Sequence, residues 1–173
     1  TAGRAGARRK TGESGAAEGM REYRPMREED LDQVLAIEEQ CFTQPWSRES
    51  MLRELRENSQ MAHYIVACEE NQVIGYGGYW QVFDEAHITN VAVAESWRRQ
   101  GVAREILAAM EREYPVRGIL YATLEVRVSN QAARALYVQN GFTEAGIRPK
   151  YYEKPQEDAV IMWKTIECAN GRS

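Results

Sequence analysis

The stretch NVAVAESWRRQGVAREIL, residues 90–107, decides the fold. It opens with the small and branched apolar residues of a β-strand, and from Gly101 its apolar residues recur at helical spacing. A helix that begins just after a strand and a loop presents unpaired backbone N–H groups and the positive end of its dipole. Because both favour an anion, and because Arg98, Arg99 and Arg104 add positive charge, the junction predicts a phosphate-binding site.

This junction also has a simpler interpretation. Gly101 would only allow a tight turn, and the arginines would only contact water. The segment lacks the GK[ST] ending of a P-loop and the GxGxxG of a dinucleotide-binding turn. Spacing alone therefore leaves both interpretations open.

Helix and strand patterns alternate on both sides of the junction. Ser47 is placed to cap the second helix, and a turn at Asn71 joins the first two strands as a hairpin. The expected elements, in chain order, are helices at 28–41 and 47–56, strands at 63–70, 73–83 and 86–95, a helix at 101–114, a strand at 119–128, a helix at 130–140, and strands at 142–152 and 158–166. This order predicts an α/β fold with a mixed sheet of about seven strands and helices on both faces.

Composition limits the function classes. A chain of 173 residues forms about one domain, and its 43% hydrophobic and 28% charged residues are ordinary for a globular protein. The chain has no apolar run long enough to cross a membrane, and the net charge of −4 argues against direct nucleic-acid binding. Cys41, Cys68 and Cys168 form no CxxC pair, and His63 and His87 are isolated. We expect a reduced, cytoplasmic protein without a metal.

The two ends of the chain differ from the centre. Residues 1–20 offer almost nothing to bury, so we expect a disordered tail, or appended residues before a natural start at Met20. The alternative is a short basic arm, from Arg4 to Lys10, that touches RNA. We expect residues 21–166 to form the folded domain and residues 167–173 to form a flexible C-terminus.

The segment LEVRVSN, residues 124–130, carries an acid in an otherwise apolar strand. Alternation places Glu125 on the face of Thr123 and Arg127, where it could merely pair with that arginine. Tyr137, in the next helix, belongs to an apolar stripe, where most tyrosines fill the core. The pattern alone assigns neither residue a role.

Four segments together resemble one family. The stretch from Arg98 to Ala103 resembles the acetyl-coenzyme A pyrophosphate loop of the GNAT acyltransferase superfamily, with Arg, two residues, Gly, one residue and Ala. LEVRVSN followed by QAARALYVQNGF is similar to the RimI-type ribosomal-protein alanine N-acetyltransferases, and PWS (45–47) and EDAVIM (157–162) agree. The resemblance implies the GNAT fold over residues 21–166, a mixed, mostly antiparallel seven-stranded sheet whose fourth and fifth strands splay apart.

The resemblance also implies an activity and a set of site residues. The chain would transfer an acetyl group directly from acetyl-CoA, its co-substrate, with Glu125 as general base and Tyr137 as general acid. Asn130 would contact acetyl-CoA, although it equally suits the N-cap of the helix that follows. The residues implied to bind acetyl-CoA are Val91, Ala92, Val93, Arg98, Arg99, Gln100, Gly101, Val102, Ala103, Arg104 and Asn130. Ala103 stands where RimI-like sequences often have Gly, and its methyl group leaves less room around the loop.

The implied acceptor is the N-terminal α-amino group of a protein. The resemblance to the RimI-type enzymes favours the N-terminal alanine of a small-subunit ribosomal protein. That partner would bind a monomer, between Phe42, Pro45 and Trp46 in one loop and Tyr151 and Tyr152 in the last hairpin. Packing of these aromatic side chains between the loops is the alternative. Two other functions stay open: acetylation of a lysine side chain or small amine, and a catalytically silent acetyl-CoA-binding or ribosome-associated module.

Overall fold

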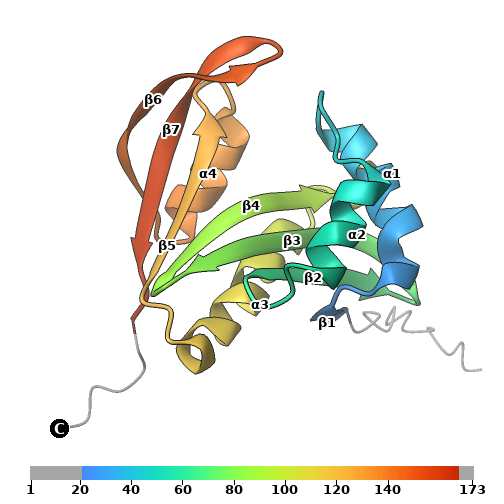
Figure 1. Ribbon diagram of the computed structural model, residues 1–173. Helices are drawn as coiled ribbons and strands as arrows, with labels where there is room; N and C mark the ends of the chain where they lie inside the picture. The colour runs from blue at the N-terminus through green and yellow to red at the C-terminus, as the bar shows by residue number, and fades with distance from the viewer. Residues whose placement is uncertain (1–20, 168–173) are drawn as a thin grey trace, which may run out of the picture.

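The computed structural model of the chain describes residues 21–167 (Figure 1). The expectations for residues 1–20, and for the end of the chain from residue 168, lie outside the described residues. A seven-stranded sheet has the order β1-β2-β3-β4-β5-β7-β6. Every neighbouring pair is antiparallel except β4 and β5, which are parallel. The predicted mixed, mostly antiparallel sheet is therefore confirmed.

The helices begin and end close to their predicted positions. A 3-10 turn at Glu28–Asp30 precedes α1, and the Ser47 hydroxyl accepts the backbone N–H of Ser50 at 3.1 Å to cap α2. The helix after the glycine runs three residues further than predicted and ends at Gly118, whose φ of 71° suits a residue without a side chain. The helices are α1 (Leu31–Cys41), α2 (Arg48–Arg56), α3 (Val102–Arg117) and α4 (Gln131–Gln139).

The strands include one that the sequence pattern did not reveal. β1 has only four residues, too few for alternation to identify, and it pairs with β2 at the edge of the sheet. The turn between β2 and β3 has φ of 51° and 66° at Glu70 and Asn71, so the predicted hairpin is confirmed. The strands are β1 (Glu22–Pro25), β2 (Ala62–Glu69), β3 (Gln72–Val82), β4 (Glu85–Val93), β5 (Tyr121–Arg127), β6 (Thr143–Glu153) and β7 (Gln156–Thr165).

The sheet opens between β4 and β5. These strands pair only near their starts, where Glu85, Ala86 and His87 lie opposite Tyr121, Ala122 and Thr123. Further along, β4 stays paired with β3 and β5 stays paired with β7. The two halves of the sheet therefore diverge as the arms of a V (Figure 1). This confirms the predicted splay and exposes one backbone edge of β4.

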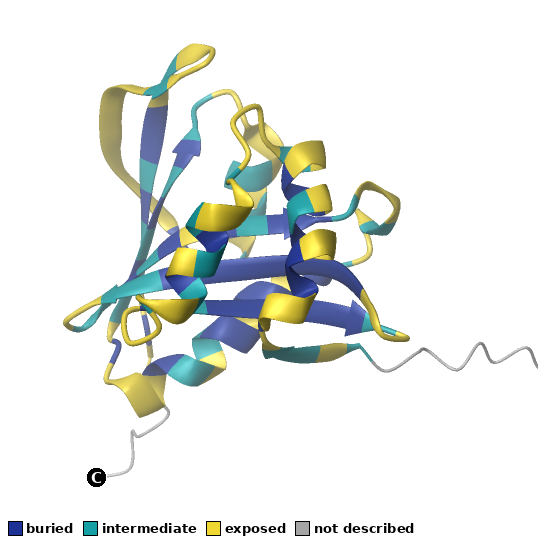
Figure 2. Ribbon diagram, turned by 45° about the vertical axis from the view of Figure 1, so that its right-hand side comes forward, coloured by how far each residue is buried: buried dark blue, intermediate teal, exposed yellow. Residues whose placement is uncertain are grey.

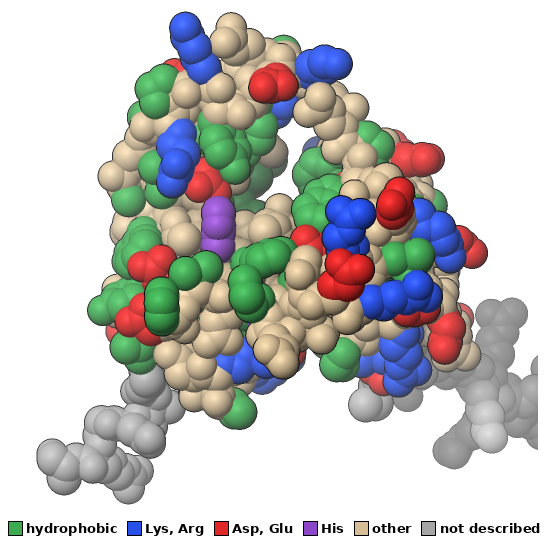
Figure 3. Space-filling view, viewed as in Figure 1, with side chains coloured by type: hydrophobic (Ala, Val, Ile, Leu, Met, Phe, Trp, Pro, Cys, Tyr) green, Lys and Arg blue, Asp and Glu red, His purple; other side chains and the backbone are tan. Residues whose placement is uncertain are grey.

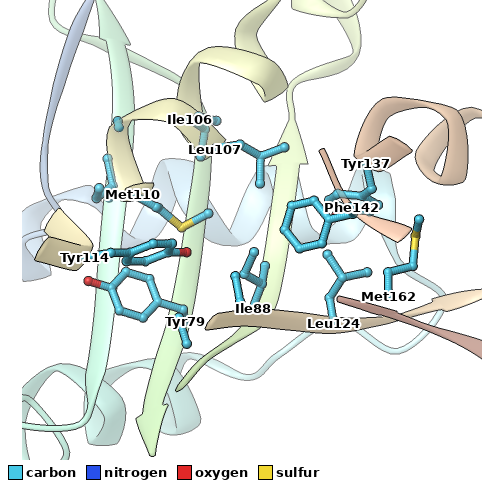
Figure 4. Close-up of a cluster of buried hydrophobic side chains, with 14 of the residues drawn as sticks. Tyr79, Ile88, Ile106, Leu107, Met110, Tyr114, Leu124, Tyr137, Phe142 and Met162 are labelled. Carbon is cyan, nitrogen blue, oxygen red and sulfur yellow. The ribbon is translucent and has the colours of Figure 1, made fainter. Parts of the chain in front are cut away.

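Two apolar cores hold the sheet, one on each face. α3 and α4 cover one face, where Ile106, Leu124 and Tyr137 belong to one buried cluster (Figure 4). α1 and α2 cover the other face of β2 and β3, and most residues of these two strands are buried (Figure 2). Burying each large apolar side chain contributes about 1.5–3 kcal/mol. Helices therefore cover both faces of the sheet, as predicted, and their packing holds β4 in place.

No helix within residues 21–167 has both the length and the apolar character that crossing a bilayer requires.

Candidate active site

The loop before α3 encloses one end of the opening. Gly101 has a φ of 77° and Arg99 a φ of 62°, so the chain turns sharply twice just before the helix begins. The loop borders a cavity of about 420 Å³ that also touches α4. Its lining residues are Val93, Trp97, Arg98, Arg99, Gly101, Val102, Ala103, Arg104, Ala132, Ala135, Leu136 and Gln139.

The charge and the helix end around this cavity favour an anion. Arg98, Arg99 and Arg104 line it beside the first turn of α3, where backbone N–H groups lack partners within the helix. Arg98 is held in place by its Nε, which donates to the Val93 carbonyl at 3.4 Å. This arrangement is the one that the anion-binding interpretation of the junction requires.

A second cavity, of about 390 Å³, occupies the opening between β4 and β5. Its walls come from β4, β5, α4, the loop between α1 and α2, and Tyr152 of the last hairpin. The Thr43 hydroxyl donates to the Lys154 carbonyl at 2.9 Å, so the loop and the hairpin touch across the opening. Figure 3 shows a hollow between the two arms of the molecule, with atoms closing over it.

Glu125 lies at the closed end of this second cavity. Its side chain is 8% exposed, and its Oε2 lies 2.5 Å from His87 Nε2. Its Oε1 lies 3.3 Å from Nε of Arg148 on β6. The hydrogen bond between Glu125 and His87 and the charge of Arg148 outweigh burial and lower the pKa of the Glu125 carboxyl below its usual range. Glu125 is therefore a carboxylate at neutral pH.

The alternative pairing of Glu125 with Arg127 is wrong. Arg127 donates instead to Glu157, at 3.3 Å, and its guanidinium lies 4.2 Å above the ring of Tyr152. The two side chains share a strand face, as alternation predicted, but β7 and the hairpin capture the arginine. Glu125 is left facing the cavity.

Tyr137 reaches the same cavity from α4. Its ring packs edge-on against Phe142, with centroids 5.7 Å apart, so it also contributes to the core (Figure 4). Burial raises the pKa of the Tyr137 phenol above its ordinary value. The hydroxyl therefore keeps its proton at neutral pH, as a general acid must.

Asn130 lies both at the start of α4, as a helix cap requires, and in the lining of the second cavity, as a contact with acetyl-CoA would require. Its side-chain oxygen accepts the backbone N–H of Ala133 at 3.1 Å, so it caps α4. It also lines the second cavity beside Glu125 and Tyr137. Capping fixes the first turn of α4, which in turn orients Tyr137 two turns later.

Not every predicted site residue lines a cavity. Ala92 is buried against α1 and α2, and its carbonyl oxygen faces Gly75 of β3, so it lies outside both linings. Gln100 turns its side chain toward the Ser96 carbonyl, at 3.4 Å, while its own carbonyl accepts from Arg21 at 3.0 Å. Pro45 and Tyr151 lie outside both linings, whereas Phe42, Trp46, Val91 and Tyr152 line the second cavity.

Two polar residues of the site, His87 and Glu38, were not predicted from the sequence. His87 had been taken as isolated, yet it contacts Glu125 across the sheet. Glu38 is fully buried, and its carboxylate accepts the Trp46 N–H and the Asn90 amide, each at 3.1 Å. This buried acid ties the α1–α2 loop to β4. Its position one residue after Ile37, on a predicted amphipathic helix, was the only sequence signal.

Residues 21–167 contain no group of three or more His, Cys, Asp or Glu side chains arranged to hold a metal ion. The side chains that line the second cavity or contact its lining include the Glu125 carboxylate, the Tyr137 phenol and the His87 imidazole.

A loop lined by three arginines lies at one end of the opened sheet and a buried acid and phenol lie at the other, as the resemblance to GNAT acyltransferases implies. A family model described as the acetyltransferase (GNAT) family matches residues 31–142, and the chain belongs to this family.

Curated relatives and a solved structure narrow the comparison. A Bacillus subtilis (strain 168) protein, named as a candidate ribosomal protein bS18-alanine N-acetyltransferase, is 41% identical over 143 residues, covering 83% of this chain and 94% of the relative. The Escherichia coli (strain K12) ribosomal protein bS18-alanine N-acetyltransferase is 36% identical over 144 residues, covering 77% and 89%. The crystal structure of the Escherichia coli ribosomal-protein-S18-alanine N-acetyltransferase superposes with a TM-score of 0.78 at 32% identity, covering 89% of this chain and 99% of that one.

Proposed function

We propose that this chain transfers the acetyl group of acetyl-CoA to the N-terminal α-amino group of a protein. The substrate proposed is the N-terminal alanine of ribosomal protein bS18, which the names of the relatives specify. The observation that carries the proposal is the buried Glu125 carboxylate, which shares one cavity with the Tyr137 hydroxyl at the point where β4 and β5 separate.

The arrangement suits the chemistry of the acceptor. An α-amino group has a pKa of about 7.7–8.0, so most of it is protonated at pH 7 and cannot attack a thioester. Glu125 would take that proton, directly or through one water. Tyr137 would donate its proton to the departing thiolate. Neither step needs a covalent acyl-enzyme.

The two cavities together fit acetyl-CoA. Three arginines and the start of α3 would hold the pyrophosphate in the first cavity. β4 runs from one cavity to the other, since Val93 lines the first and Val91 the second. The exposed edge of β4 would therefore hold the extended arm and donate backbone N–H groups to the acetyl carbonyl oxygen, where each such donor is worth about 3–4 kcal/mol in other enzymes.

The contact across the opening favours a chain end as the acceptor. Thr43 and Lys154 join the two walls above the cavity, so the acceptor has to reach Glu125 beneath or beside that contact. A free N-terminus has flanking chain on one side only. A lysine within a folded surface would bring its flanking chain against both walls.

Mass spectrometry of peptides incubated with acetyl-CoA tests the proposal. Both peptides have the same sequence, which begins with Ala followed by a basic residue and contains one internal lysine, and the N-terminus of the control is blocked. We expect acetylation on the α-nitrogen of the unblocked peptide only. Acetylation confined to the lysine would contradict the N-terminal assignment, and acetyl-CoA binding without transfer to any amine would indicate a silent module.

A further inference from the structure

His87 lies at the closed end of the V, where β4 and β5 begin to separate. It is the last residue of β4 that pairs with β5, opposite Thr123. Glu125 lies two residues beyond Thr123, so its side chain projects from the same face of the sheet. The imidazole thus meets the carboxylate at 2.5 Å, between Nε2 and Oε2.

A buried base needs a route by which its proton leaves. The Glu125 side chain is 8% exposed, whereas the His87 side chain is 39% exposed. On the face shown in Figure 3, a histidine reaches the surface beside an acidic and a basic side chain. His87 is therefore in contact with Glu125 on one side and with solvent on the other.

Only one of the two charged partners of Glu125 can accept a proton. Arg148 contacts Oε1 at 3.3 Å, but a guanidinium has no acceptor nitrogen and stays protonated. An imidazole gains and loses a proton near neutral pH. His87 is thus the partner that can relieve a protonated Glu125.

We propose that His87 is the positioning residue of the general base and the exit for its proton, an inference that rests on the function proposed above. The N–H bond of the acceptor ammonium breaks, an O–H bond forms on Glu125, and the freed lone pair of nitrogen attacks the acetyl carbonyl. The C–S bond then breaks, the departing thiolate takes the proton of the Tyr137 hydroxyl, and the second proton of the nitrogen passes to Tyr137 and restores its hydroxyl. The proton on Glu125 then moves to Nε2 of neutral His87 in the tautomer that carries its proton on Nδ1, and His87 becomes imidazolium. The imidazolium loses its Nδ1 proton to water and Glu125 is again a carboxylate; proton exchange with water then returns His87 to the Nδ1–H tautomer for the next turnover.

This route makes the chemical step depend on pH. Three charged groups act on His87: Glu125 from β5, Arg148 from β6 and Glu85 from its own strand. The hydrogen bond to Glu125 dominates and raises the pKa of His87 above its ordinary value of 6.5. A protonated His87 cannot accept a second proton at Nε2. The rate of transfer should therefore be low below that pKa and rise as the pH increases through it.

The test compares the wild-type chain with the variant His87→Gln. Single-turnover rates of acetylation are measured between pH 5.5 and 9 with the peptide that the wild-type chain acetylates fastest. Glutamine can still donate a hydrogen bond to Glu125 but cannot titrate. We expect the wild-type acid limb to have a midpoint above 6.5, and the variant to be slowed by on the order of 10-fold at pH 8 with that limb shifted to lower pH. The matched control, His63→Gln, should keep the wild-type profile.

A second variant separates proton transfer from positioning. His87→Ala removes both, and added imidazole should restore part of its rate, because the site is open to solvent on that side. An unchanged acid limb in His87→Gln, or His87→Ala at the wild-type rate, would overturn the inference. The two failures are distinguishable. If the wild-type chain acetylates no peptide, the proposed function is wrong, and this result does not depend on the His87 variants.

Discussion

Replacing Glu125 with glutamine removes the proposed general base with little change of shape. The amide of glutamine still reaches His87, but it cannot take a proton from an ammonium. A positioned base contributes roughly 100- to 10,000-fold to a rate. Because His87 and Arg148 lower the pKa of Glu125, it is a weaker base than an ordinary glutamate. We therefore expect the lower end of that range, a loss of about 100-fold, or about 2.7 kcal/mol of transition-state stabilisation.

The assay is the initial rate of peptide acetylation at saturating acetyl-CoA, with acetyl-CoA affinity measured by calorimetry. The rate should fall while the affinity stays close to that of the wild type, since the first cavity is unchanged. Glu144→Gln is the matched control, because Glu144 pairs with Arg134 on the surface and does not line the second cavity. A Glu125→Gln rate within about threefold of the control would refute the assignment of a base.

Three further substitutions test other parts of the site. Tyr137→Phe keeps the packing against Phe142 but removes the hydroxyl, so acetylation should slow by roughly 100-fold at unchanged acetyl-CoA affinity, measured by the same rate and calorimetric assays. Gly101→Ala places a side chain at a φ of 77°, which should cost about 1–2 kcal/mol in urea unfolding and weaken acetyl-CoA binding; an unchanged midpoint would contradict the loop geometry. Asn130→Ala removes the cap of α4 and should lower the free energy of unfolding by about 1 kcal/mol, whereas wild-type stability would show that the 3.1 Å bond to Ala133 contributes nothing.

Local patterns in the sequence predicted most of the fold. The caps and turns at Ser47 and Asn71 fall where predicted, because short-range hydrogen bonds and backbone preferences decide them. The predicted start of the helix after Gly101 was correct, but its predicted end fell three residues too early. The helix continues through Pro115, although the missing N–H of that proline removes one hydrogen bond to the preceding turn, and Gly118 then ends it.

The partners of the site residues could not be predicted in the same way. Alternation placed Glu125 on the correct strand face, but the identity of its neighbour depends on the register between β4 and β5. His87 lies 38 residues away in sequence, and no local pattern links the two. Arg127 was the neighbour suggested by proximity along the chain, and β7 draws it to Glu157 instead. Long-range register therefore decides which charges meet.

A crystal structure of the chain with a conjugate of CoA and an Ala-initiated peptide, joined through the acetyl group, tests the central claim most directly. We expect the alanine nitrogen within about 2.6–3.2 Å of a Glu125 oxygen, or one water away, in the cavity that Glu125 shares with Tyr137. We also expect the sulfur beside the Tyr137 hydroxyl and the pyrophosphate at the start of α3. A conjugate whose nitrogen lies outside that cavity, with neither Glu125 nor Tyr137 near the reacting atoms, would contradict the claim.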